Sequence, residues 1–301
     1  LSRPLPFLRQ IQTLFTKGSA AGGSLWAEKR EKHMEEKKKG GKRAAPNRRG
    51  WLLAVLVLAG LGIWGILEWR AHTAPGPGIS VNEEALTRRE PFYQYDAPGV
   101  TARAGVDVSS YQRNVDWPAV KAAGADFAML RVGFRGYGTG ALVEDNAFAQ
   151  NAADAANAGL TVGVYFYSQA VTEEEAAEEA RFVVERLRGT NVSGPIAYDL
   201  EFYTADEART DDLTGEQATQ NALAFCDVIR QAGYEPVVYM NLHWAGSMYG
   251  MEELAHLPVW LASYGPVPAL DRGVTLWQYS ESGVVDGIEG PVDLDLWFTK
   301  E

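Results

Sequence analysis

Two carboxylates lie two residues apart at the end of an apolar run that is typical of a β-strand. The run covers residues 196–201, and Asp199 and Glu201 project from one face because residues i and i+2 of a strand do so. Two acids held together in a pocket do not both ionise easily, so one keeps its proton to a higher pH. Such a pair can supply a general acid beside a charge-stabilising carboxylate. The alternative is a strand that ends in a solvated acidic loop, since four more acids follow between residues 206 and 212.

The elements that must position this pair follow an alternating pattern from residue 104 onward. Short strands are predicted over 104–108, 126–132, 161–167, 195–201, 235–241, 258–263, 274–279 and 292–297. Helical patterns lie between them over 117–123, 145–158, 172–188, 215–232 and 243–255. Alternation of this kind predicts a parallel sheet, and eight strands favour closure into a barrel. The expected fold class is α/β, an irregular (β/α) TIM-like barrel with eight strands and fewer than eight helices, because the last two connections are too short for helices. An open doubly wound sheet is the alternative, although no glycine-rich phosphate fingerprint follows the first strand.

Polar residues collect where these strands end, which is where a barrel of this type places its chemistry. They are Asp107, Tyr165, Tyr167, Asp199, Glu201, Tyr239, Asn241, Trp277, Gln278, Tyr279, Asp293 and Asp295. A barrel core with so many acids would be unstable unless the acids line a wet cleft. We therefore expect these side chains to surround a groove.

Aromatic side chains in the same positions indicate what the groove binds. Tyr165, Tyr167, Tyr239, Tyr264 and Trp277 either fill the core or form flat apolar walls. Such walls suit stacking on sugar rings, and tyrosine hydroxyls and side-chain amides match sugar hydroxyl and acetamido groups. Acids without nearby His or Cys favour glycoside chemistry over metal-assisted hydrolysis, so neither a metal nor another cofactor is expected.

The charge of the chain is divided unevenly. Residues 1–70 carry 14 Lys/Arg against 5 Asp/Glu, and the remaining 231 of the 301 residues carry 14 against 34. A basic head joined to an acidic body favours membrane attachment over nucleic-acid binding, and no nucleic-acid partner is expected.

The amino-terminal third predicts an anchor. Residues 51–67 contain no charged side chain, and ten Lys/Arg lie between residues 29 and 49, so the positive-inside rule leaves the amino terminus cytoplasmic. The predicted organisation is a basic tail over 1–50, a single transmembrane helix over 51–69, a stalk over 70–102 and an extracytoplasmic barrel over 103–301. Met34 is the first methionine, so residues 1–33 are interpreted as an over-extended gene start. A cleaved signal peptide is the competing interpretation.

An ordered set of short motifs resembles glycoside hydrolase family 25, the Chalaropsis-type lysozymes. The motifs are Asp107-Val108-Ser109 with Tyr111-Gln112, Phe127 to Gly133, Val162 to Tyr167, Asp199-Leu200-Glu201, Val259 to Tyr264, Trp277-Gln278-Tyr279-Ser280 and Val292 to Asp295. The likeness spans about residues 103–299, and it is the combination, more than any one motif, that is specific.

The resemblance implies a monomeric barrel that cuts the β-1,4 bond between N-acetylmuramic acid and N-acetylglucosamine in peptidoglycan. Glu201 matches the general acid of the family, Asp199 its partner, and Asp107 and Asp293 two further acids of the cleft. The resemblance assigns sugar contacts to Tyr165, Tyr167, Tyr239 and Gln278, and Trp277 belongs to the aromatic walls inferred above. Many members have His where Phe166 or Tyr167 stands, and Asp295 replaces a common Asn.

Alternatives remain open at the level of the sequence. The same groove would suit a non-catalytic peptidoglycan-binding module, or a glycosidase that acts on another N-acetylglucosamine polymer such as chitin. The residues alone also leave open inversion, a covalent intermediate and assistance from the substrate's acetamido group.

Overall fold

The computed structural model describes residues 77–202 and 206–301. The predicted cytoplasmic tail over 1–50 and the predicted transmembrane helix over 51–69 lie outside these residues. Within them, no helix is both long enough and apolar enough to cross a bilayer.

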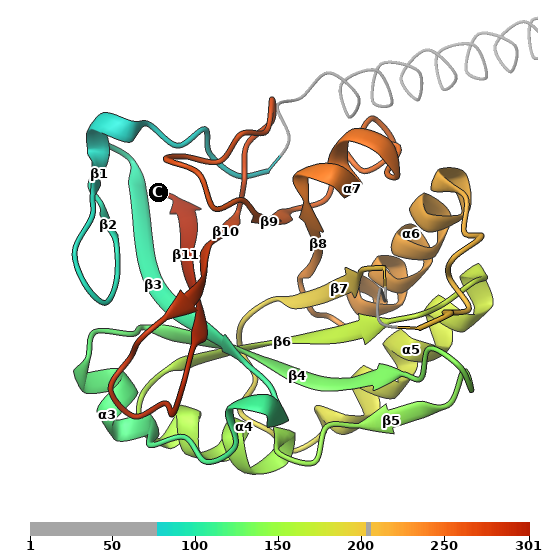
Figure 1. Cartoon of the computed structure of the whole chain (residues 1–301), viewed down its shortest axis with the longest axis horizontal. Helices are drawn as coiled ribbons and strands as arrows, with labels where there is room; N and C mark the ends of the chain where they lie inside the picture. The colour runs from blue at the N-terminus through green and yellow to red at the C-terminus, as the bar shows by residue number, and fades with distance from the viewer. Residues whose placement is uncertain (1–76, 203–205) are drawn as a thin grey trace, which may run out of the picture. The chain divides into compact units, whose positions relative to one another are not determined.

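Eight strands close into a barrel (Figure 1). In spatial order they are β3 (Val100–Val108), β11 (Val292–Lys300), β10 (Leu276–Gly283), β9 (Val259–Ala262), β8 (Pro236–Asn241), β7 (Ile196–Leu200), β6 (Thr161–Ser168) and β4 (Phe127–Arg135). Pairing of β4 with β3 completes the ring, and a short strand, β5 (Leu142–Glu144), extends the edge of β4. All eight predicted strands are present, and the prediction of a closed barrel is confirmed.

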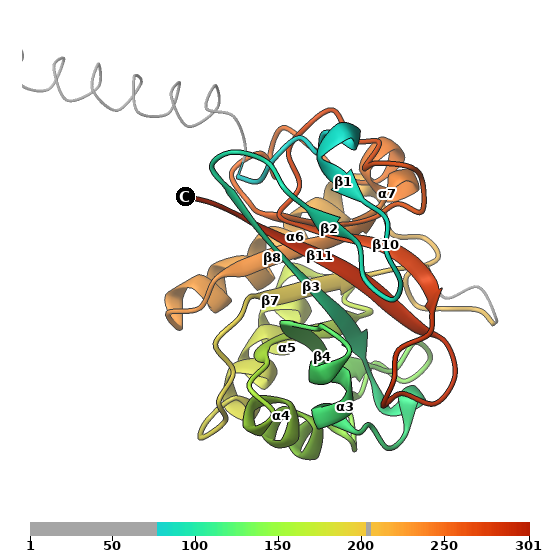
Figure 2. The same cartoon turned by 90° about the vertical axis from the view of Figure 1, so that its left-hand side faces the viewer.

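The direction of the last strand differs from the prediction of a parallel sheet. Strand β11 runs antiparallel to both of its neighbours, β10 and β3, and the three lie side by side in Figure 2. Only residues 284–291 connect β10 to β11. A parallel crossover needs a dozen or more residues, so this short connection forces the chain to reverse.

The helices lie on the outside of the barrel and are unevenly distributed. They are α3 (Trp117–Ala122), α4 (Phe148–Asn157), α5 (Glu173–Arg186), α6 (Gly215–Gln231) and α7 (Leu242–Ser247). Thr172 and Thr214 cap α5 and α6 by accepting hydrogen bonds from backbone N–H groups in the first turn. The helix predicted over 243–255 ends at Ser247, in a stretch that contains Gly246 and Gly250. Within the described chain no helix follows β9 or β10, as predicted.

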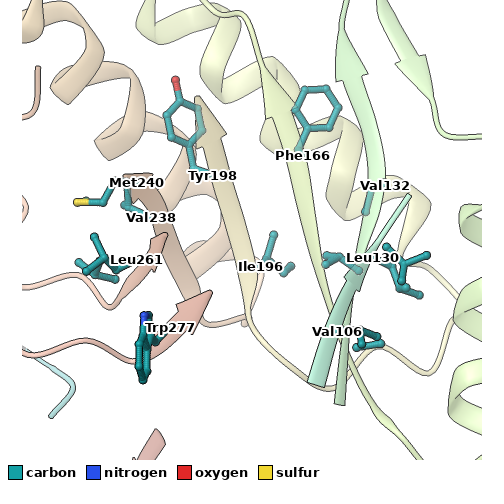
Figure 3. Close-up of a cluster of buried hydrophobic side chains, with 14 of the residues drawn as sticks. Val106, Leu130, Val132, Phe166, Ile196, Tyr198, Val238, Met240, Leu261 and Trp277 are labelled. Carbon is teal, nitrogen blue, oxygen red and sulfur yellow. The ribbon is translucent and has the colours of Figure 1, made fainter. Parts of the chain in front are cut away.

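Side chains alternate between the barrel interior and the layer beneath the helices. In β7, Tyr198 and Leu200 pack outward with the main core, whereas Ala197 and Asp199 face inward. Figure 3 shows outward-facing members of the main core, Tyr198 and Trp277 among them. Gly163 faces inward against Met129, where a Cβ atom would collide, so the glycine lets the strands close around a narrow interior.

The predicted stalk is wrong for residues 77–102. Ile79 forms a β-bridge with Val274, and Tyr93 stacks on Tyr279 with ring centroids 4.3 Å apart. Strands β1 (Leu86–Thr87) and β2 (Gln94–Tyr95) pair in the same segment. The physical reason is the missing helix after β9: the outer face of β10 carries Trp277 and Tyr279, and this segment covers it. The segment was predicted to be a stalk because it is rich in Pro, Gly and charged residues, and its few apolar contact residues, such as Ile79 and Tyr93, give no periodic pattern.

Candidate active site

A cavity of about 240 Å³ opens at one rim of the barrel. We call it the acidic pocket. Its lining residues are Asp107, Ser109, Tyr111, Gln112, Arg131, Tyr165, Tyr167, Asp199, Glu201, Tyr239, Trp260, Gln278 and Asp293. The structure therefore brings together all four acids predicted to be catalytic and four of the five residues predicted to contact sugar.

The reversed direction of β11 explains how its acids reach this rim. Asp107 lies near the carboxyl end of β3, whereas Asp293 is the second residue of β11, and the two are directly paired across the antiparallel ladder. Asp295 pairs with Gly105 two residues deeper in the barrel and is fully buried. Asp293 thus joins the carboxyl ends of the parallel strands from the amino end of its own strand.

Asp199 and Glu201 occupy different depths of the acidic pocket. Asp199 is buried within β7, and its Oδ1 atom has no hydrogen-bond partner. Glu201 follows the last residue of β7 and is half-buried. Burial raises the pKa of both carboxyl groups; the charge of Glu201 raises that of Asp199 further, and the charge of Asp293 raises that of Glu201. The pair therefore retains a proton to higher pH, and Glu201 is the member placed to deliver it outward.

A second group of acids comes from β3 and β11, with Asp107 and Asp293 lining the acidic pocket and Asp295 buried beneath them. Burial, together with the charges of Asp293 and Asp295, raises the pKa of Asp107 well above its ordinary value. Burial also raises the pKa of Asp293 to about 6 and that of Asp295 to about 8. One oxygen of Asp295 accepts a hydrogen bond from Trp260 Nε1 at 2.8 Å. Three neighbouring carboxyl groups in this setting do not all ionise at neutral pH.

Gln278 organises the polar side of the acidic pocket. Its Oε1 atom accepts hydrogen bonds from the hydroxyls of Tyr239 at 3.3 Å and Tyr264 at 3.0 Å. Two donors on that oxygen fix the orientation of the amide, so Nε2 faces Asp107 and donates to Oδ2 at 2.8 Å. Glu201 is a second acceptor for the Tyr239 hydroxyl, whose single proton goes to either Gln278 or Glu201, and Tyr239 thereby links the two groups of acids.

Trp277, predicted to contact sugar, lies outside the acidic pocket. Its side chain, shown in Figure 3, is fully buried beneath the segment of residues 77–102. The indole Nε1 donates a hydrogen bond to the backbone oxygen of Ser263 at 2.7 Å. Gln278 faces the barrel interior, so its neighbour must face outward in a strand. Asn241, which was also expected to surround the groove, does not line the acidic pocket. Its side chain instead caps α7 by accepting a hydrogen bond from the backbone N–H of Trp244.

Five lining residues were not singled out from the sequence as catalytic or as sugar contacts, namely Ser109, Tyr111, Gln112, Arg131 and Trp260. Trp260 packs edge-on against Tyr165 and Tyr239 inside the barrel. Arg131 faces inward from β4, and Tyr111 is 81% exposed at the mouth, 5.1 Å from the Arg131 guanidinium. Strict alternation along residues 127–131 and 259–262 is the signal that could have identified Arg131 and Trp260, whereas Tyr111 lies in a turn.

The described residues hold no cluster of three or more His, Cys, Asp or Glu side chains arranged to bind a metal ion. In the acidic pocket Asp107 accepts from the Gln278 amide and Glu201 from the Tyr239 hydroxyl, and beneath it Asp295 accepts from the Trp260 indole.

Fold and site together define a barrel of the glycoside hydrolase type, with carboxyl groups and aromatic side chains converging at one rim. The profile of glycosyl hydrolases family 25 matches residues 106–288, which is more than half of the chain. The chain belongs to this family.

Relatives of established name share part of this sequence. The chain is 28% identical over 192 residues to the autolytic lysozyme of Clostridium acetobutylicum, in a match that covers 64% of this chain but only 54% of that protein. It is 29% identical over 286 residues to lysozyme M1 of Streptomyces globisporus, covering 82% of this chain and 91% of that protein.

Solved structures support the fold. The modular autolysin LytC of Streptococcus pneumoniae, determined in complex with a synthetic peptidoglycan ligand, superposes with a TM-score of 0.59 at 23% identity. That match covers 71% of this chain and 52% of LytC.

Proposed function

We propose that this protein is an N-acetylmuramidase that hydrolyses the β-1,4 bond between N-acetylmuramic acid and N-acetylglucosamine in peptidoglycan. The observation that carries the proposal is the convergence of Asp107, Asp199, Glu201 and Asp293 on one pocket, in a chain that belongs to glycosyl hydrolases family 25. The names of the curated relatives, both lysozymes, support the same substrate.

In the proposed mechanism Glu201 protonates the leaving oxygen of the glycosidic bond. Its raised pKa keeps it protonated to a higher pH than an exposed glutamate, and its half-buried position at the rim gives it access to substrate. The sugar then develops oxocarbenium character, which negative charge on the acids beneath it stabilises. Asp199 lies deepest of the β7 pair and serves this role, or orients the acetamido group of the substrate.

The remaining groups position the glycan. Gln278 and Tyr239 form the polar side, and Tyr165 and Trp260 form an aromatic wall inside the barrel. Asp107 and Asp293 face the same space from β3 and β11. Aromatic faces fit the apolar faces of sugar rings, while the amide and hydroxyl groups match the polar edges.

The experiment that tests this function is release of reducing ends from purified peptidoglycan by wild type and Glu201→Gln. The variant retains the size of the side chain but lacks the proton donor, so release falls by at least about 10²-fold while glycan binding persists. Glu235→Gln, at an exposed glutamate before β8, is the matched control and retains full activity.

Two outcomes would replace the proposal. A wild-type protein that binds peptidoglycan as tightly as the variant, with neither releasing reducing ends, would identify a binding module. Release from chitin without release from peptidoglycan would identify a glycosidase of another N-acetylglucosamine polymer.

We further propose that residues 51–69 anchor the protein in the cell membrane as a single-pass helix, with the amino terminus cytoplasmic and the barrel extracytoplasmic. The support is the uncharged run over residues 51–67 and the ten basic residues that precede it. The full chain should stay in the membrane pellet after alkaline carbonate extraction, and the barrel should be digested by protease added to spheroplasts. Release of the full chain by carbonate would contradict the anchor.

A further inference from the structure

Glu201 lies just outside the hydrogen-bonded ladders of the barrel. The last register pairs of β7 are Leu200 with Ser168 on one side and Asp199 with Tyr239 on the other. Glu201 itself belongs to no register pair, although its side chain is the proposed proton donor. A side-chain contact from outside the ladders also holds its backbone.

A buried glutamine provides that contact. Gln169 directly follows β6 and is 0% exposed. Its Nε2 atom donates to the backbone oxygen of Glu201 at 3.1 Å, and its Oε1 atom accepts from the hydroxyl of Thr210 at 2.9 Å. Thr210 is also 0% exposed, so the bond between the Gln169 and Thr210 side chains is shielded from water.

The two bonds of Gln169 connect three separate parts of the chain. One end of the amide holds the residue after β7, and the other holds the turn that precedes α6. Gln169 is itself fixed by its neighbours, because Ser168 Oγ donates to Glu179 Oε2 at 2.6 Å and Ala170 O accepts from Asn221 Nδ2 at 2.9 Å. A buried amide held in this way has one defined orientation.

We propose that Gln169 is a positioning residue for catalysis: it fixes the backbone of Glu201, and thereby the direction in which the Glu201 carboxyl group delivers its proton. This inference rests on the proposed function and names a residue that acts through the proton donor. A buried polar side chain is costly unless its hydrogen bonds are made, so a simple packing role would suit an apolar residue better.

The proposal predicts that loss of the Gln169 amide lowers the rate of the chemical step and leaves substrate binding unchanged. Gln169 does not line the acidic pocket, so its loss should leave substrate contacts in place. A shift of the Glu201 backbone by about 1 Å can lower the rate of the chemical step by up to about 10²-fold. We therefore expect kcat to fall while KM stays within about twofold.

The experiment compares four proteins for kcat, KM and thermal midpoint on soluble peptidoglycan fragments. Gln169→Met removes both hydrogen bonds of the amide with little change in volume. Thr210→Val removes only the hydroxyl that holds the far end of the amide. Thr219→Val is the matched control, because Thr219 is equally buried and hydrogen bonded, but to Gly215 O and Gly250 N, away from Gln169.

We expect Gln169→Met to lower kcat by about 10- to 100-fold. Thr210→Val should lower kcat by a smaller factor, and Thr219→Val should lower the thermal midpoint without changing kcat. In the Glu201→Gln background Gln169→Met should cause no further loss of rate, since both changes act on one group.

An active wild type with an unchanged kcat in Gln169→Met, measured well below its thermal midpoint, would overturn the positioning role alone. An equal fall of kcat in Thr219→Val would also overturn it, because any buried hydrogen bond would then suffice. A wild type that releases no reducing ends would instead overturn the proposed function, and with it this role.

Discussion

Asp293 lies directly opposite Asp107 in the antiparallel ladder of β11 and β3, although the two residues belong to opposite ends of the domain. The pairing places one carboxyl group from the amino end of a strand beside one from a carboxyl end. Asp295, two residues further along β11, then lies beneath them in the barrel interior. The carboxyl groups of Asp107 and Asp293 thus lie together because β11 runs antiparallel to β3.

The buried acid Asp295 should make stability depend on pH. Burial raises its pKa to about 8 from an ordinary value of 3.8, so the folded protein binds more protons than the unfolded chain between these values. Stability contributed by the protonated form is therefore complete below about pH 4 and is lost as pH rises through about 8. Asp295→Asn keeps an acceptor for Trp260 and carries no charge at any pH. Its thermal midpoint should exceed that of wild type by several degrees at pH 8.5 and by little at pH 5.

The control for this prediction is Asp286→Asn, a change at an exposed aspartate between β10 and β11. It should shift the midpoint equally at both pH values. A gain for Asp295→Asn that is as large at pH 5 as at pH 8.5 would show that ionisation of this group is not the cause.

The hydroxyl of Tyr239 should lower the pKa of Glu201, the proposed proton donor. Burial raises the pKa of Glu201, and the hydrogen bond from Tyr239 opposes that rise. Tyr239→Phe removes the bond, so the pKa of Glu201 rises further and the basic limb of the kcat/KM profile shifts to higher pH, by up to about one unit. Tyr264→Phe is the matched control, because it removes the other hydroxyl donor to Gln278 Oε1. A basic limb that moves to lower pH in Tyr239→Phe would contradict this role.

Trp277 should matter for folding and not for substrate. Its indole is fully buried, and Nε1 donates to Ser263 O. Trp277→Phe leaves that oxygen without its donor and opens a cavity, so the free energy of unfolding should fall by about 2 kcal/mol or more. KM measured at 20 °C should stay unchanged. A raised KM with an unaltered denaturation midpoint would place Trp277 in the glycan site after all.

Tyr111 should behave in the opposite way. Its ring is 81% exposed at the mouth of the acidic pocket, so its removal costs little stability. Tyr111→Ala should raise KM by about 3- to 10-fold, the effect of losing about 1 kcal/mol of stacking on a sugar ring. Denaturation curves of variant and wild type should coincide. An unchanged KM would exclude this ring from the substrate wall.

Local pattern was sufficient to predict several features. The alternation of strand and helix patterns predicted all eight barrel strands, and the spacing of Asp199 and Glu201 placed both on one face. Thr172 and Thr214, which cap the two longest helices, α5 and α6, lie within one residue of the starts of the patterns predicted over 172–188 and 215–232. These signals are readable because backbone periodicity and cap chemistry involve residues only a few positions apart.

Other features depend on contacts between residues that are distant in the chain. Gln278 faces Asp107 across 171 positions of sequence, and that pairing decides that Gln278 faces inward while Trp277 faces outward. The direction of β11 follows from a connection of eight residues, and the covering of β10 by residues 77–102 follows from a helix that is missing elsewhere. The sequence by itself thus determined the elements and the identity of the acids. Only the closed barrel decided which side chains share a pocket, because closure brings distant strands within hydrogen-bonding distance.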